Sequence, residues 1–173
     1  KVLYQSGMLT KNPVDNTMVL GEVQVYPLST DTFDNPTCQR SDPFFVMTDW
    51  CLESLRLPKH AIMSIGYDSL ELVALTAGID VFKPNSLTSN SSVRVLDLCC
   101  GCGVQGLFAA KRSISWADPD IRCELYAMDI NPRVCRFVCA NACLNGLVSE
   151  TNTIYSIEAD LYQPLHAENT GDL

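Results

Sequence analysis

The chain has 173 residues, of which 47% are hydrophobic and 18% charged, a balance that predicts a folded core and excludes a disordered tail. Its 20 acidic residues outnumber the 12 basic ones, and the net charge is −8. Binding nucleic acid without sequence preference requires a basic face, so we expect no nonspecific nucleic-acid binding. No apolar run is long enough to span a bilayer, so we expect no membrane insertion.

The nine cysteines are an odd number, and most lie within apolar runs. This distribution favours a reduced, cytoplasmic protein over a disulfide-bonded secreted one; the chain begins with Lys1, which leaves a preceding leader open. Cys135, Cys139 and Cys143 recur at every fourth position of one predicted helix. Successive side chains at that spacing are about 6 Å apart along the axis, so we interpret these three as small buried core residues and not as a metal site.

Residues 1–90 are predicted to form a small β-rich or mixed accessory region. Strands are expected at 19–28 and 44–50, where β-branched and aromatic residues are frequent. A short helix at 50–57, an extended segment at 62–66 and a helix at 68–77 follow, the last with Asp68 and Glu71 in the spacing of a capping box. A polar linker at 82–92 marks the boundary with the second part of the chain.

Residues 91–173 alternate between strands and helices. The apolar runs at 93–100, 124–130 and 153–162 are predicted strands, and 104–114 and 132–147 are predicted helices. This alternation is typical of βαβ units. The predicted fold class is therefore α/β, with a partial Rossmann-like parallel sheet preceded by the β-rich region.

An acid lies at or near the end of each predicted parallel strand. Ligands bind at the carboxyl edge of such a sheet, where these acids would meet. The first strand runs into glycines spaced G-x-G-x-x-G, which allow a sharp turn and the close approach of a ligand. Together these features predict a nucleoside-binding site, with a purely structural turn as the alternative. The acids are Asp97, Asp129 and Asp160, and the glycines are Gly101, Gly103 and Gly106.

Asp97 distinguishes between the possible nucleoside cofactors. It lies four residues before Gly101, where a carboxylate would repel the pyrophosphate that a helix N-terminus binds in a dinucleotide fold. A cofactor with a positive group is a better match. S-adenosylmethionine carries both an ammonium and a sulfonium, so it is the predicted cofactor.

Three segments resemble class I S-adenosylmethionine-dependent methyltransferases. V-L-D-L-C-C-G-C-G-V-Q-G at 95–106 is similar to their first motif, and A-M-D-I-N-P-R and I-E-A-D-L-Y-Q-P-L are similar to their second and third acidic strand ends. The D-x-N-P-R, N-A-C-L-N-G and A-D-L-Y-x-P phrases more narrowly resemble the methyltransferase small domain family, which includes release-factor glutamine and ribosomal-RNA guanine methyltransferases. The resemblance covers residues 92 to about 165.

The resemblance implies a role for each residue of the site. Asp129 would accept hydrogen bonds from both ribose hydroxyls, Ile130 would pack on the adenine, and Asp160 would bind its amino group beside the Leu161 backbone. Asp97 would hold the methionine end together with the turn at 99–103, in which Cys99 replaces a glycine common in the family. Contact of Asp68 and Ser69 with the cofactor is a further implication; an ordinary helix cap is the alternative. The implied cofactor-binding residues are Asp97, Cys99, Gly101, Gly103, Asp129, Ile130, Asp160 and Leu161.

The acceptor motif of the family, N-P-P-[YF], does not occur in the sequence. Only three of the seven strands of the complete fold are predicted, so we expect a C-terminally truncated domain that does not transfer methyl groups by itself. The predicted function is N-methylation of an amino or amide group on a protein or RNA acceptor, with no catalytic residue in this chain. The alternatives are a nicotinamide-dependent oxidoreductase and a noncatalytic binding module of the same fold.

Overall fold

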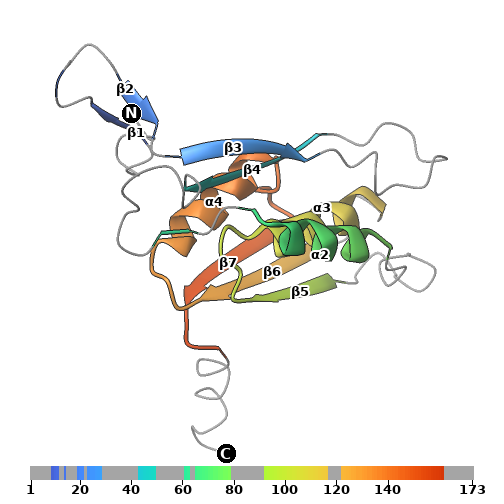
Figure 1. Cartoon of the computed structure of the whole chain (residues 1–173). Coiled ribbons are helices and arrows are strands. Elements are labelled where there is room, and N and C mark those ends of the chain that lie inside the picture. Colours follow the sequence, from blue (N-terminus) through green and yellow to red (C-terminus); the bar gives the residue numbers. More distant parts are fainter. Residues whose placement is uncertain are drawn as a thin grey trace, which may run out of the picture.

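The alternating strands and helices of the second part of the chain form a parallel sheet (Figure 1). In this computed structural model, strands β5 (Ser92–Leu98), β6 (Arg122–Asp129) and β7 (Asn152–Glu158) lie in the order β5-β6-β7, and both pairings are parallel. The prediction of an α/β fold with a parallel sheet is confirmed. The structure describes residues 9–11, 14, 19–21, 23–28, 43–49, 61–62, 65–78, 92–116 and 122–161.

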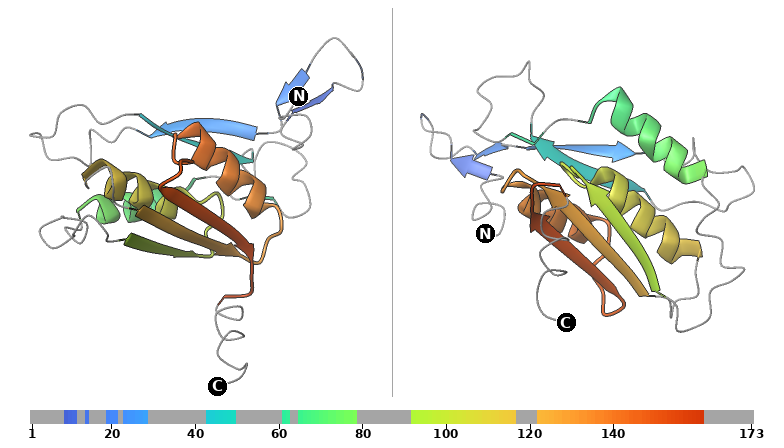
Figure 2. Two further views of the ribbon diagram at one scale, coloured as in Figure 1. Left: turned by 180° about the vertical axis from the view of Figure 1, so that it is seen from behind. Right: turned by 90° about the horizontal axis from the view of Figure 1, so that it is seen from below.

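Helices α3 (Val104–Trp116) and α4 (Val134–Leu144) cover one face of this sheet (Figure 2). Alternate side chains of β6, including Leu125 and Ala127, are buried on that face. Leu107 and Val138 belong to the same hydrophobic core. α4 begins two residues after Pro132, which was the predicted first position; the turn at 131–133 precedes it.

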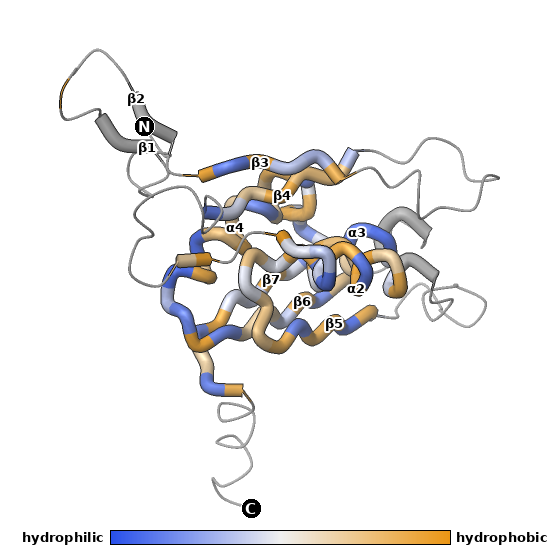
Figure 3. Tube along the Cα trace, in the orientation of Figure 1, coloured by the Kyte–Doolittle hydropathy of each residue, from blue (hydrophilic) through white to orange (hydrophobic). Residues whose placement is uncertain are grey.

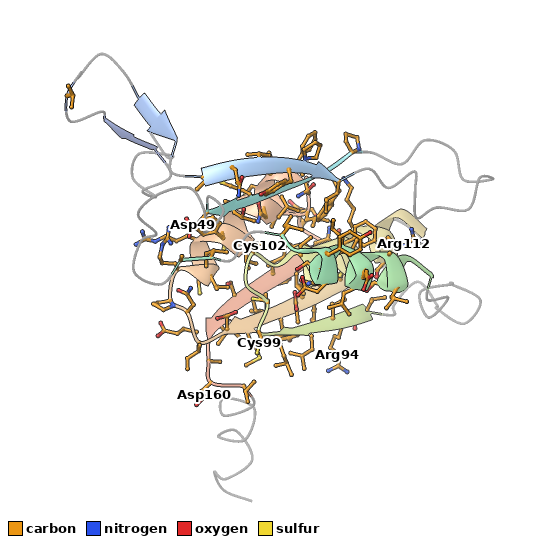
Figure 4. All side chains as sticks on the ribbon, viewed as in Figure 1. Asp49, Arg94, Cys99, Cys102, Arg112 and Asp160 are labelled. Carbon is orange, nitrogen blue, oxygen red and sulfur yellow. The ribbon has the colours of Figure 1, made fainter. Side chains whose placement is uncertain are left out.

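The opposite face of the sheet is more open in the described part of the chain. Leu96 is 49% exposed and Tyr155 is 41% exposed, and Tyr155 stacks on Tyr126 with ring centroids 4.7 Å apart. The alternation of polar and apolar residues along the strands is visible in Figure 3. The side chain of Arg94 extends from β5 away from the helices (Figure 4). Each strand therefore has a buried face and a more exposed one.

The N-terminal region contains two antiparallel strand pairs. β1 (Leu9–Lys11) pairs with β2 (Val19–Gly21), and β3 (Val23–Leu28) pairs with β4 (Phe44–Asp49). The region is β-rich as predicted, but the strand expected at 19–28 is divided between the two pairs. The predicted helix at 50–57 and the domain boundary at 90–91 lie outside the described residues.

Helix α2 (Tyr67–Gly78) packs against α3. It begins one residue before the start predicted from Asp68, and the Leu70 N–H donates to the Gly66 carbonyl. Asp68 therefore lies in the first turn and does not cap the helix, so the predicted capping box is wrong. An acid in the first turn still interacts favourably with the helix dipole.

Strand β4 lies on the side of α4 that faces away from the parallel sheet. Its Phe44 and Val46 are fully buried and share one core with the helices and the sheet. The Phe44 ring also packs edge-on against Phe108 of α3, with centroids 5.5 Å apart. The β3–β4 hairpin is thus a third layer, and it is continuous with the core of the parallel sheet.

Two asparagines of α4 bind the backbone of β4. The Asn141 side chain accepts from the Met47 N–H and donates to the Met47 carbonyl, at 2.7 and 3.0 Å. Asn145 makes the same pair of bonds with Phe45, at 2.8 and 2.6 Å. Four helix residues rise about 6 Å and two strand residues about 6.6 Å, so the two spacings match. The amides satisfy backbone groups of β4 as a neighbouring strand would.

The helix stripe of cysteines differs from its prediction. Cys139 and Cys143 are exposed, and Cys135 is half-buried with its thiol 3.4 Å from the Ser156 carbonyl. Their interpretation as buried core residues is therefore wrong for Cys139 and Cys143. The core face of α4 is instead occupied by larger residues such as Phe137 and Val138.

Within the described ranges, no helix is long and apolar enough to cross a membrane.

Candidate functional site

The predicted acids lie at the carboxyl edge of the parallel sheet. Asp97 is the penultimate residue of β5, Asp129 is the last residue of β6, and Asp160 follows the end of β7 by two residues. Parallel pairing brings these three strand ends to one edge. Cys99 and Asp160 are both labelled at this edge in Figure 4. The structure thus places all three acids along one rim, as their positions in the sequence predicted.

The turn after β5 is fixed by hydrogen bonds to β6. The Cys100 N–H donates to the Met128 carbonyl at 3.0 Å, and the Gly101 N–H donates to Asp129 Oδ2 at 2.9 Å. The chain has positive φ at Cys99 (56°), Gly101 (52°) and Gly103 (79°), a conformation that favours glycine. The glycine turn, residues 99–103, is therefore held directly against Asp129.

Glycine is suited to each of the three positions for a different structural reason. A Cβ on Gly101 would meet nothing within 4 Å, so its backbone is open to a ligand. Gly103 is buried, and a Cβ there would lie 3.0 Å from Val138 Cγ2. A Cβ on Gly106 would lie 2.7 Å from the Asp97 side chain. Only Gly101 matches the expectation of close ligand approach, while the other two permit close packing of α4 and β5.

The Asp97 side chain extends from β5 to the N-terminal end of α3. Its Oδ2 accepts from the Gly106 N–H at 2.8 Å, so a carboxylate already satisfies one backbone donor of the first helical turn. Burial raises the pKa of Asp97 above its ordinary value of 3.8, and the charge of Asp129 raises it further, while the bond from Gly106 opposes both effects. The result is a partly buried acid beside a second acid, an arrangement that favours a cationic ligand group.

Asp129 uses both of its carboxylate oxygens. Oδ2 accepts from the Gly101 N–H and Oδ1 accepts from the Asn131 N–H, each at 2.9 Å. Its backbone carbonyl also accepts from the Ala159 N–H at 2.8 Å, which links the ends of β6 and β7. Each carboxylate oxygen has about two lone-pair sites, so the same carboxylate has capacity for two further hydroxyl donors. Asp129 is thus fixed in position and chemically suited to a vicinal diol.

The apolar residues predicted to contact an adenine lie at the surface of this edge. Ile130 is 68% exposed and Leu161 is 51% exposed. Leu161 has a φ of 48°, which a leucine rarely adopts, and Asp160 beside it is exposed. The Ile130 side chain is therefore accessible to a planar ring, and the Leu161 backbone lies next to the exposed Asp160.

The buried thiols of the turn are poorly suited to metal binding. Burial raises the pKa of Cys102 to about 11, and burial with the charges of Asp97 and Asp129 also raises the pKa of Cys100. Thiols bind metals as thiolates, and in the absence of a metal both effects favour the protonated thiol. No group of three or more His, Cys, Asp or Glu residues in the described segments is arranged to hold a metal ion.

Sequence reasoning missed three residues that support this edge. Asp49 of β4 and Arg133 form a bidentate ion pair with distances of 2.6 and 2.9 Å. Asn141 donates at 2.9 Å to the Cys102 carbonyl, in addition to its bonds with β4. Asn145 lies four residues after Asn141 and ends the helix, where its N–H donates to the Asn141 carbonyl. Their four-residue spacing on the buried side of a helix was the available signal.

No protein-family model matches the chain, and a search of the curated proteins gave no match.

Proposed function

We propose that this chain forms the cofactor-binding part of an S-adenosylmethionine-dependent methyltransferase. The observation that supports it most is the contact of Asp97 with the Gly106 N–H at the start of α3. In a dinucleotide fold the N–H groups of this turn bind a pyrophosphate. Here a carboxylate takes that place, which disfavours a phosphate and favours the ammonium and sulfonium of S-adenosylmethionine.

The remaining edge is compatible with the nucleoside part of the same cofactor. The Asp129 carboxylate is oriented by two backbone N–H groups and would accept the two ribose hydroxyls. Ile130 would pack on the adenine, with Asp160 and Leu161 at its other side. Cys99, Gly101 and Gly103 would surround the methionine end together with Asp97. We also propose that this parallel sheet with its helices is part of a methyltransferase-type fold.

The proposed reaction is N-methylation of an amino or amide group on a protein or RNA. Methyl transfer from a sulfonium releases a neutral thioether, so the cofactor site needs no strong acid, and alignment of the acceptor provides much of the rate. The role of the residues described here would be to bind and orient the cofactor. Cytoplasmic localisation, which the free cysteines favour, belongs to the same proposal.

Titration calorimetry with S-adenosylhomocysteine and NAD tests this function. We expect the chain to bind S-adenosylhomocysteine in preference to NAD, and Asp129→Ala to weaken that binding by at least about tenfold, because hydrogen bonds to a charged acceptor are lost. Glu150→Gln is the matched control, since Glu150 is an exposed acid near the opposite ends of the strands. Preference for NAD would instead support the oxidoreductase alternative.

A methyl-transfer assay distinguishes an enzyme from a binding module. Labelled S-adenosylmethionine would be incubated with the protein and with a protein or RNA extract. Because the sequence contains no N-P-P-[YF] motif, we expect this chain by itself to bind the cofactor without transfer. Transfer to an acceptor would contradict that expectation and would exclude the noncatalytic alternative.

A further inference from the structure

Asp49 is a buried acid that the proposed cofactor contacts do not include. It lies at the end of β4 and is 1% exposed. Its Oδ2 accepts from Arg133 Nη1 at 2.6 Å and from the Ile62 N–H at 2.5 Å, and its Oδ1 accepts from Arg133 Nη2 at 2.9 Å. The N-terminal region therefore reaches the start of α4 through a buried carboxylate; Figure 4 labels Asp49 on this side of the molecule.

Arg133 is connected to Asp129 through one intermediate residue. The Arg133 N–H donates to Asn131 Oδ1 at 3.0 Å, and the Asn131 N–H donates to Asp129 Oδ1 at 2.9 Å. Asn131 Nδ2 also lies 3.4 Å from the Ala61 carbonyl. The five-residue segment 129–133 is therefore fixed at one end by the Asp129 carboxylate and at the other by Asp49.

The chemistry of the ion pair favours a role in orientation over a role in stability. The Asp49 side chain is 1% exposed and that of Arg133 is 27% exposed, and taking a charged pair out of water carries a desolvation penalty that often equals or exceeds its attraction. The planar guanidinium, however, holds a carboxylate in one geometry through two parallel bonds. Arg133 is also placed over the Phe137 ring, 5.4 Å from its centroid, which further restricts the guanidinium.

We propose that Asp49 and Arg133 are positioning residues for the Asp129 carboxylate. The pair holds segment 129–133 so that Asn131 orients Asp129 Oδ1 for a vicinal diol. The β3–β4 hairpin thereby sets the selectivity of the site for a ribose without contacting the ligand. This inference rests on the proposed function, because the diol is the ribose of the proposed cofactor.

The test compares two ligands that differ only in the diol. Dissociation constants would be measured by calorimetry for S-adenosylhomocysteine and its 2′,3′-dideoxy analogue, with the unmodified chain and with Asp49→Asn and Arg133→Lys. We expect the unmodified chain to prefer the ribose ligand. In both variants, the ratio of the two dissociation constants should be about tenfold smaller. Arg133→Lys keeps the charge but not the two-bond geometry, and it provides the test if Asp49→Asn does not fold.

Asn145→Ala is the matched control. It removes the bonds of α4 with Phe45 and loosens the same hairpin at the end of α4 away from Asp129. We expect it to lower stability and to leave the ligand preference unchanged. A merely structural role of Asp49 would give the same result in its own variants.

The outcomes separate the two proposals. If the unmodified chain binds neither ligand, the proposed function fails. If it binds and prefers the ribose ligand, but Asp49→Asn and Arg133→Lys keep the full preference, the positioning role alone is wrong.

Discussion

The two ends of α4 hold the β3–β4 hairpin by different chemistry. At the end near the sheet edge, Arg133 binds Asp49 through a charged, two-bond contact. At the other end, the neutral side chains of Asn141 and Asn145 bind the backbone of β4. A neutral amide that satisfies a buried donor and acceptor stabilises the fold with a small desolvation penalty, whereas a buried ion pair gains little stability. The amide end therefore mainly stabilises the fold, although Asn141 also bonds to Cys102 of the glycine turn. The charged end has geometry suited to a site.

The largest expected effect is at the amide end. Asn141→Leu preserves the size of the side chain but leaves the Met47 N–H and the carbonyls of Met47 and Cys102 without their amide partner. Because each buried group left unsatisfied costs about 1–3 kcal/mol, we expect the free energy of unfolding to fall by about 3 kcal/mol or more. Urea denaturation measures this change.

Ser149→Ala is the control for this experiment, since Ser149 is exposed and bonds only to Thr151 in the described residues. A loss below about 1 kcal/mol for Asn141→Leu would contradict the assignment of the amide end to stability.

A smaller effect on stability is expected at Asp97, whose ionised carboxylate should favour cofactor binding and lower the free energy of unfolding. Burial raises the pKa of Asp97 above 3.8. Its contribution to stability is therefore fully present below the unfolded pKa and is lost as pH rises through the folded pKa. At neutral pH the ionised acid destabilises the fold, so we expect Asp97→Asn, which can still accept from Gly106, to raise the melting temperature. This gain should diminish as the pH is lowered.

The same variant should weaken S-adenosylhomocysteine binding, because the carboxylate is the proposed partner of the cofactor ammonium. Affinity in the unmodified chain should also fall on acidification through the raised pKa of Asp97. A variant with lower stability and unchanged affinity at pH 7 would assign Asp97 to the fold alone. Thermal unfolding and calorimetry on the same samples distinguish these results.

The sheet and its acidic edge could be predicted because both depend on local patterns. Each pattern involves residues that are close together in the sequence: the apolar strands, the glycine spacing, and Asp129 at the end of a strand. Asp49 and Arg133 are separated by 84 positions in the sequence, and Met47 and Asn141 are separated by 94. No periodicity within a segment encodes such pairs. The division of the strand expected at 19–28 likewise depends on partners elsewhere in the chain, since β2 pairs with β1 and β3 pairs with β4.

The smallest expected effect concerns Cys99, the exposed residue at which the turn departs from the pattern it resembles. Its φ of 56° lies in the left-handed region, which costs a residue with a Cβ roughly 1–2 kcal/mol. Glycine removes this strain but adds conformational freedom to the unfolded chain, at about 0.4–1 kcal/mol. We therefore expect Cys99→Gly to raise the free energy of unfolding by about 0.5 kcal/mol. Cys99→Ala removes the thiol and keeps the Cβ, so an equal gain in both variants would trace the effect to the thiol and not to the backbone.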